Sequence, residues 1–305
     1  MAQSSEYEQI EAIRTARQLS DLSGTFGTES IHEIYFSAKA VWQSVLRERQ
    51  QKRADTPGLA GTTVDIDGQE FHVHGITHVG TEAEREYLRS YVTEYLDSGA
   101  SVYCEQGIRS MYLDDFRDVC EMDDYLWAMD RCEEVETDSH VDGRSGSESV
   151  FQEIASVTGQ LRQATFSLID SGSSMYSERF ERALGDIAAS FLSGHADVGV
   201  GKSYEAFRLR AEASRNPDRL VDLQEYYERT FLPQPLEREW LRYHDPELEI
   251  MSHARNERMA DYGVYHNQET DTVHLVVGAA HQPGVVYYLE QYRDSRELPV
   301  EFELY

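Results

Sequence analysis

Two short segments, far apart in the chain, share the pattern that most constrains the fold. In each, an apolar run stops at a glycine, a histidine follows three residues later, and a helical pattern begins soon after. The segments are Phe71-His-Val-His-Gly75-Ile-Thr-His78-Val-Gly80 and His274-Leu-Val-Val-Gly278-Ala-Ala-His281-Gln-Pro-Gly284. The pattern predicts two strands that each deliver a histidine at the carboxyl end, where the two ends can meet in one site.

The residues around the first histidine predict how these strands are connected. Residues 62–75 have the pattern of a hairpin about an Asp-Gly turn, and residues 81–96 have helical spacing. Residues 101–105 then form a short apolar run that ends in Glu105. Strand, helix and strand in this order indicate a right-handed parallel crossover, so we expect His78 and Glu105 at the same edge of the sheet.

Helical spacing dominates the rest of the chain. The expected helices cover residues 5–22, 30–50, 149–171, 176–193, 203–230 and 236–262, with prolines at their breaks, and two further strands are expected at 272–277 and 300–304. The predicted fold class is α/β, a small mixed, largely parallel sheet with flanking helices and a large helical insertion. We expect an N-terminal helical segment at 1–60 and an α/β domain at 61–305, with the insertion at about 110–262.

The composition bears on partners and location. The net charge is -28, and the lysines are Lys39, Lys52 and Lys202. This balance argues against nucleic acid as a partner, and is typical of halophilic, acidic proteins, whose surfaces suit a cytoplasm of very high salt. No apolar run reaches the length of a membrane span and no targeting segment is evident, so a soluble cytoplasmic protein is expected. The three cysteines lack the spacing of a disulfide framework or a metal site.

The helix before the last strands carries an arginine on an apolar face. Met251, Arg255, Met259 and Tyr262 share that face if the segment is helical. Burying an unpaired charge costs several kcal/mol, so Arg255 needs an anionic partner. It either pairs with a structural carboxylate, or it has a role in a site, where it orients Glu105 or binds an anionic intermediate.

One competing motif lies within the helical part. The stretch Ala196-Asp-Val-Gly-Val-Gly201-Lys202-Ser203 satisfies a loose phosphate-loop pattern. The residues before it have the pattern of a helix end rather than of a buried strand, and no later apolar strand ends in an aspartate for Mg²⁺. The context therefore favours a loop between helices over a nucleotide site.

The motifs together resemble the TraB/PrgY family, which is in the same superfamily as the Tiki metalloproteases and is related to erythromycin-esterase-like proteins. The resemblance covers about residues 70–292 and consists of four segments in the same order: Gly75-Ile-Thr-His78-Val, the strand ending in Glu105, Arg255-Asn256-Glu257-Arg258-Met259, and Val276-Val-Gly278-Ala-Ala-His281-Gln-Pro-Gly284. Two departures stand out: no second acid directly follows Glu105, and the residues up to Tyr305 contain no apolar run like the C-terminal membrane helices of many relatives.

The resemblance implies a peptidase-like hydrolase that depends on a divalent metal (Mn²⁺, Zn²⁺ or Co²⁺). The implied metal ligands are His78, His281 and Glu105. Glu105, Arg255 and Asn256 are the implied catalytic residues, and the glycines of the two motifs, Gly75 and Gly278, would lie against the cofactor. The substrate would be a peptide or a small acyl compound, and a homo-oligomer is possible.

The residues themselves leave several alternatives open. Two histidines and one glutamate suffice for a catalytic metal site with an open position. They also suffice for a metal-free site in which one histidine is a general base oriented by Glu105. The same cleft would serve a non-catalytic peptide-binding or regulatory protein, or the histidines would simply be hydrogen-bonded in the sheet. His72 and His74 alternate along a strand and either pack there or add a ligand.

Overall fold

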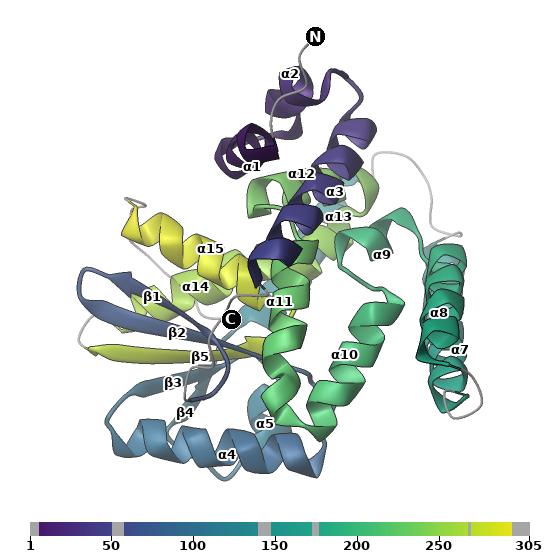
Figure 1. Cartoon of the computed structure of the whole chain (residues 1–305). Helices are drawn as coiled ribbons and strands as arrows, with labels where there is room; N and C mark the ends of the chain where they lie inside the picture. The colour runs from purple at the N-terminus through teal and green to yellow at the C-terminus, as the bar shows by residue number, and fades with distance from the viewer. Residues whose placement is uncertain (1–5, 51–57, 140–147, 173–176, 268–269, 295–305) are drawn as a thin grey trace.

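The strands form one mixed sheet that is largely parallel, as predicted (Figure 1). The computed structural model describes residues 6–50, 58–139, 148–172, 177–267 and 270–294. Within them the strands are β1 (Thr62–Ile66), β2 (Gln69–Ile76), β3 (Ser101–Cys104), β4 (Val119–Glu121) and β5 (Thr272–Gly278). Their order is β1-β2-β5-β3-β4, and only the β1–β2 hairpin is antiparallel. The fold is therefore α/β.

The register of the sheet brings three strand ends together. Ile76 of β2 lies opposite Gly278 of β5, and Cys104 of β3 lies opposite Val276. Because the three strands are parallel neighbours with β5 in the middle, the residues that follow them leave the sheet along one edge. The two glycine-histidine segments and Glu105 follow these strands directly.

Helices cover both faces of the sheet. Side chains alternate along β5, so Val273, Leu275 and Val277 pack against α14 (Arg255–Tyr265) and α15 (Gln282–Arg293). Val276 points to the other face, toward α4 (Glu82–Asp97). Both layers are visible in Figure 1, with α4 below the sheet and α15 above it. Burial on both faces accounts for the near-continuous apolar run of β5.

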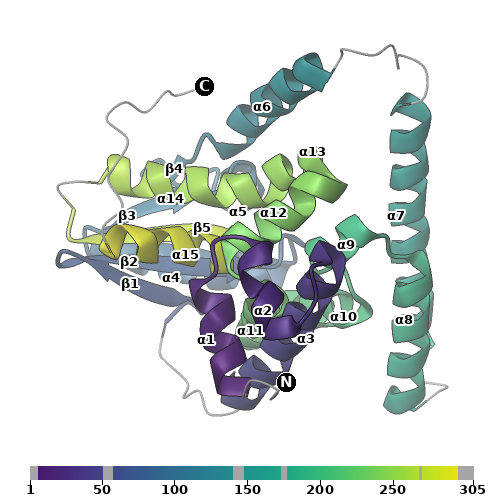
Figure 2. The ribbon, with the colours of Figure 1, turned by 90° about the horizontal axis from the view of Figure 1, so that it is seen from above.

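The remaining helices lie beyond the strand ends and to one side. They are α1 (Glu6–Thr15), η1 (Leu19–Leu22), α2 (Ser23–Phe26), α3 (Ile31–Gln50), α5 (Ile108–Tyr112), α6 (Asp124–Ser139), α7 (Glu148–Ser171), α8 (Glu178–Leu192), α9 (His195–Gly199), α10 (Tyr204–Arg215), η2 (Pro217–Arg219), α11 (Leu220–Thr230), α12 (Gln234–His244), α13 (Pro246–Leu248) and η3 (Glu249–Ala254). The N-terminal helices pack around Trp240 of α12, and α7 and α8 form a pair at the side of the molecule (Figure 2). None of the helices in the described ranges has both the length and the apolar character needed to cross a membrane.

Several elements differ from the sequence prediction. β4 was not predicted; it lies within the expected insertion at about 110–262 and extends the sheet past β3. The helix expected at 203–230 is divided at Pro217 into α10 and α11, because proline cannot continue the hydrogen-bonding pattern. The helix expected at 236–262 contains the π-helical turn η3 just before α14. The strand expected at 300–304 lies outside the described residues.

Candidate functional site

His78 reaches the site through an unusual backbone conformation. The preceding residue, Thr77, is fixed by Glu84, whose Oε1 accepts from its N–H at 2.7 Å and whose Oε2 accepts from its hydroxyl at 2.8 Å. His78 itself has a φ of 59°, in the left-handed region that non-glycine residues rarely adopt. Such strain persists only where the surroundings impose it, and it is common at functional sites. The imidazole Nε2 of His78 thereby comes within 3.3 Å of the Oε2 of Glu105.

Glu105 is the centre of the cluster. Its side chain is buried, and both carboxylate oxygens have partners. Oε2 accepts from the backbone N–H of Gly278 at 2.8 Å, and Oε1 accepts from Nη2 of Arg255 at 2.7 Å. The Nε2 of His281 lies 3.5 Å from Oε1. The structure therefore brings together the residues predicted to be ligands, one from each of the three strand ends.

Arg255 bridges two buried carboxylates. Besides Glu105, it donates to Asp124 from Nε at 2.8 Å and from Nη2, and its Nη1 donates to the carbonyl of Met251 at 3.3 Å. Asp124 is fully buried at the start of α6, and its Oδ1 accepts from the backbone N–H of Gln106 at 3.0 Å. All three nitrogens of the guanidinium are engaged within the protein. This arrangement fits the predicted role of orienting Glu105.

Asn256 fixes the orientation of His281. Its Oδ1 lies 2.7 Å from Nδ1 of His281, and its Nδ2 donates to Oε1 of Gln234 at 3.1 Å. Because the amide nitrogen is committed to Gln234, the amide oxygen accepts the proton of Nδ1. His281 therefore carries its proton on Nδ1 and presents the lone pair of Nε2 to Glu105.

The glycines of the second motif allow this close packing. A Cβ on Gly278 would lie 2.8 Å from Nε2 of His78, and one on Gly284 would lie 2.0 Å from Nδ2 of Asn256. Neither space admits a methyl group without displacing a side chain of the site. Gly75 differs, because it lies outside the histidine cluster. A Cβ added to it would lie 2.6 Å from Oε1 of Gln282.

Burial and charge shift the pKa values of the cluster. Burial alone raises the pKa of Glu105, but His281, His78 and Arg255 outweigh it and hold that pKa well below its usual range. Burial lowers the pKa of His281 to about 4 against the opposing effect of Glu105. Burial also raises the pKa of Asp124 against the opposing effect of Arg255, and the nearby Glu105 adds to the rise. One guanidinium thus serves two carboxylates, and the site has an excess of negative charge.

Asp124 and Gln234 were missed by the sequence prediction. Asp124 supplies the acid that is absent directly after Glu105, but from the end of the next strand, β4. The sequence gives no clear signal for Asp124, because β4 has only three residues and two of them are exposed. Gln234 gives no signal either, since its role depends only on its contact with Asn256.

The chain resembles no characterised protein closely enough to assign a family. No protein-family model matches it, and no curated protein or solved structure is significantly similar. The TraB/PrgY resemblance therefore stays a prediction that rests on the short motifs. Function has to be argued from the site.

The donor set was compared with what a metal ion requires. Among the described residues, no group of three or more His, Cys, Asp or Glu side chains is assembled to hold a metal ion. The reason is visible at Glu105, where the two histidines approach different oxygens and Arg255 occupies one of them. The types of donor fit nevertheless, because imidazole and carboxylate side chains are common ligands of a catalytic Zn²⁺.

Two other predicted features lie outside this cluster. His72 and His74 are not in it; His74 is hydrogen-bonded to His274 and to the carbonyls of Leu59 and Ala60 in the middle of the sheet. The phosphate-loop-like stretch follows α8 and includes the short helix α9, so the strand that a phosphate loop requires is absent there.

Proposed function

We propose that the protein is a hydrolase of peptide or small acyl bonds, and that His78, His281 and Glu105 hold a divalent metal ion at the edge of the sheet. The observation that carries the proposal is the pair formed by His281 and Glu105. An unprotonated Nε2 faces a carboxylate oxygen at 3.5 Å, and Asn256 prevents the imidazole from turning its protonated nitrogen there. Two electron-rich groups at this distance repel each other unless a cation joins them.

The separations agree with this interpretation. Ligands about 2.0–2.1 Å from a tetrahedral Zn²⁺ lie roughly 3.3 Å from one another. Nε2 of His78 lies 3.3 Å from Oε2 of Glu105, and Nε2 of His281 lies 3.5 Å from Oε1, so each histidine is near this separation from a different oxygen of the carboxylate. The excess negative charge around Arg255 favours a cation for the same reason. Metal-ligating histidines also usually donate their other N–H to an oxygen, as His281 does to Asn256.

The protein's own groups have distinct tasks in this proposal. Arg255 and the N–H of Gly278 hold the Glu105 carboxylate, and Asp124 holds Arg255. His78 has the more exposed of the two imidazoles, so it is the group that meets a substrate or a water molecule. A divalent ion would supply Lewis acidity, which polarises an acyl carbonyl and acidifies water.

The metal-free alternative uses the same residues. The Nε2–H of His78 would donate to Glu105, which leaves Nδ1 to take a proton from an attacking water molecule. Both versions predict that His78 and Glu105 are needed for hydrolysis. Only the metal version predicts that His281 is a ligand.

Metal binding to purified protein tests the proposal directly. We expect tight binding of Mn²⁺, Zn²⁺ or Co²⁺ by titration calorimetry, and a loss of at least about a hundredfold in affinity in His78→Ala and in His281→Ala. His72→Ala is the matched control, because His72 is on β2 and contacts Thr63 and Glu70 instead.

Three outcomes decide between the versions. Equal affinity in all variants, or no binding by the unaltered protein, would rule out the metal site. Hydrolysis without metal that is lost in His78→Ala and kept in His281→Ala would favour the general-base version. Absence of hydrolysis with intact peptide binding would favour the non-catalytic alternative.

A further inference from the structure

A pocket next to the site concentrates positive charge in a strongly acidic protein. It has a volume of about 350 Å³ and lies where α7 and α10 meet the residues that follow β2. The chain has 56 acidic and 28 basic residues, yet none of the fourteen residues that line the pocket is acidic. Its basic residues are Arg162, Lys202, Arg210 and Arg215. The lining therefore differs in charge from the rest of this acidic chain.

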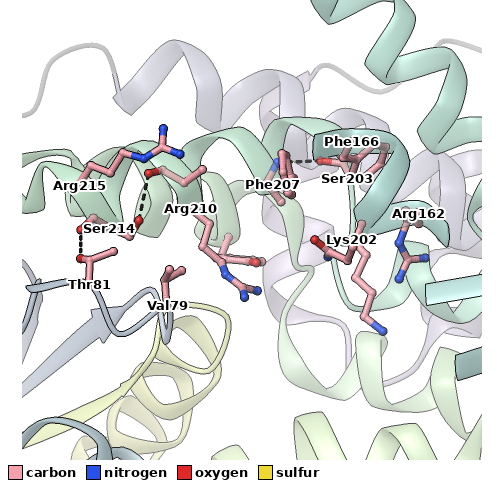
Figure 3. A pocket seen from close by; sticks show the side chains of 14 residues that line it. Val79, Thr81, Arg162, Phe166, Lys202, Ser203, Phe207, Arg210, Ser214 and Arg215 are labelled. Carbon is pink, nitrogen blue, oxygen red and sulfur yellow. Dashed lines mark hydrogen bonds between the residues drawn. The ribbon is translucent and has the colours of Figure 1, made fainter. Parts of the chain in front are cut away.

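The basic side chains differ in how far they are already neutralised. Arg162 is buried and pairs with Asp197 at 2.8 Å, and Lys202 shares that carboxylate at 3.5 Å. Arg210 has no ion pair with any of the described residues. In Figure 3, Lys202 and Arg210 extend in the same direction, whereas the guanidinium of Arg215 points the opposite way. One carboxylate thus pairs with two cations, and Arg210 adds a third positive charge, which leaves net positive charge in the pocket.

The start of α10 adds donors to the same pocket. Ser203 lines it and caps this helix, with its hydroxyl accepting from the N–H of Ala206 at 3.1 Å. The positive end of the helix dipole therefore lies beside Lys202. Lys202 and Ser203 belong to the stretch that resembles a phosphate loop, so these residues line an anion pocket although the architecture is different.

The other wall of the pocket is apolar. Phe166 and Phe207 pack on each other at 5.5 Å between ring centroids, and Tyr227 lies on the same pocket. The wall nearest the site is formed by Val79, the residue directly after His78. A ligand held here would have an anionic group beside an apolar or aromatic one, and could extend from the pocket toward His78.

We propose that this pocket binds the anionic group of the substrate, a carboxylate or a phosphate attached to an apolar or aromatic body, and places the bond to be cleaved at His78. The identification of the ligand as a substrate rests on the proposed function, whereas anion binding by the pocket does not. The specificity would come from Arg162, Lys202 and Arg210, and the aromatic wall would accept the body.

Calorimetric titration with small probes tests the anion preference. N-acetylphenylalanine and phenyl phosphate carry the two anionic groups, and N-acetylphenylalanine amide is the neutral probe of the same shape. We expect the anionic probes to bind at least about tenfold more tightly than the amide, since a charge-assisted hydrogen bond contributes about that much. The tighter of the two anionic probes identifies the group. Equal binding of the anionic and neutral probes would overturn the proposal.

Matched variants assign the binding to this pocket. In the double variant Lys202→Gln/Arg210→Gln, affinity for the anionic probe should fall about tenfold or more while the amide is unaffected. Arg208→Gln is the control, because Arg208 is on the same helix but pairs with Glu212 and does not line the pocket. Unchanged anion affinity in the double variant would also overturn the proposal.

The experiments distinguish failure of the anion-pocket proposal from failure of the hydrolase proposal. His78→Ala should retain probe binding, because His78 does not line the pocket. Anion binding that depends on Lys202 and Arg210, without any hydrolysis, would support the anion site and contradict the hydrolase proposal. Hydrolysis by the unaltered protein with the same KM for charged and neutral substrates would remove the anion site and leave the hydrolase.

Discussion

The sheet contains two groups of histidines whose surroundings differ sharply. The edge cluster is His78 and His281 on Glu105, and the mid-sheet pair is His74 and His274, stacked with Tyr95. In the mid-sheet pair, Nδ1 of His74 faces the carbonyl of Leu59 at 3.1 Å, and its Nε2 faces Nδ1 of His274 at 2.9 Å.

The difference lies in the partners of the imidazole nitrogens. One proton on each mid-sheet ring completes a chain of hydrogen bonds from His274 through His74 to a carbonyl, with no carboxylate involved. In the edge cluster, a lone pair of His281 faces an anion. A buried histidine is therefore a candidate ligand only where its unprotonated nitrogen lacks a donor.

The largest effect is expected from Arg255→Met, which breaks the charge balance of the edge cluster. Two buried carboxylates then lose their shared cation, and such losses cost about 3–5 kcal/mol of unfolding free energy. Urea denaturation measures it. Adding Asp124→Asn should restore part of the loss, and Arg219→Met, which breaks only surface pairs with Asp222 and Glu212, should cost less than about 1 kcal/mol. A loss no larger than that of Arg219→Met would show that the two carboxylates do not depend on Arg255.

The mid-sheet pair should make stability depend on pH. Burial lowers the pKa of His74 from 6.5 to about 4, and burial lowers that of His274 to about 3. Below pH 6.5 the unfolded chain therefore binds more protons than the folded protein. The free energy of unfolding falls as the pH drops from 6.5 until the pKa values of the folded state are reached. His74 alone accounts for about 3 kcal/mol of this loss.

Replacing both rings with phenylalanine tests this pH dependence. In His74→Phe/His274→Phe, stacking on Tyr95 is kept and titration is removed, so the unfolding free energy should change less between pH 6.5 and 4 than in the unaltered protein. Urea midpoints at several pH values give the slope. An unchanged slope would mean that other groups cause the acid sensitivity.

The smallest effects should come from two glycines, one beside each group. A Cβ on Gly278 would lie 2.8 Å from Nε2 of His78, and one on Gly61 would lie 2.7 Å from Nδ1 of His74. We expect Gly278→Ala to lower metal affinity about tenfold and Gly61→Ala to leave it unchanged, while both lower the thermal midpoint by a few degrees. Equal metal affinity in the two variants would show that the edge cluster does not differ from the mid-sheet pair in metal binding.

The sequence predicted those parts of the fold and site that depend on short runs of neighbouring residues. The apolar runs that stop at Gly75 and Gly278, and the run that ends at Glu105, gave the parallel strands and the edge at which they meet. Asp124 was missed because β4 has only three residues, two of them exposed, so no alternation marks it. The register between strands also has no local signal. This register sets His274 opposite His72, and so within hydrogen-bond distance of His74, which makes the mid-sheet pair.

The anion pocket was beyond prediction for a related reason. Its cations come from α7, from the loop before α10 and from α10 itself, and only the packing of these helices brings them together. Lys202 was recognised in the sequence, but in a pattern whose usual architecture is absent here. The edge cluster was predictable because each of its residues directly follows a parallel strand, whereas the pocket depends on how helices pack against one another.

The π-helical turn η3, which directly precedes Arg255, changes the direction in which the side chains on either side of it point. A π turn contains one residue more than an α turn, so the residues before it are rotated by about 100° relative to an uninterrupted α-helix. Upstream of the extra residue, Glu249 faces Arg238, and downstream, Arg255 faces Glu105. A chain shortened by one residue between them could satisfy only one of these ion pairs. The extra residue of this turn therefore allows two ion pairs to form together, the one between Glu249 and Arg238 of α12 and the one that orients Glu105 at the sheet edge.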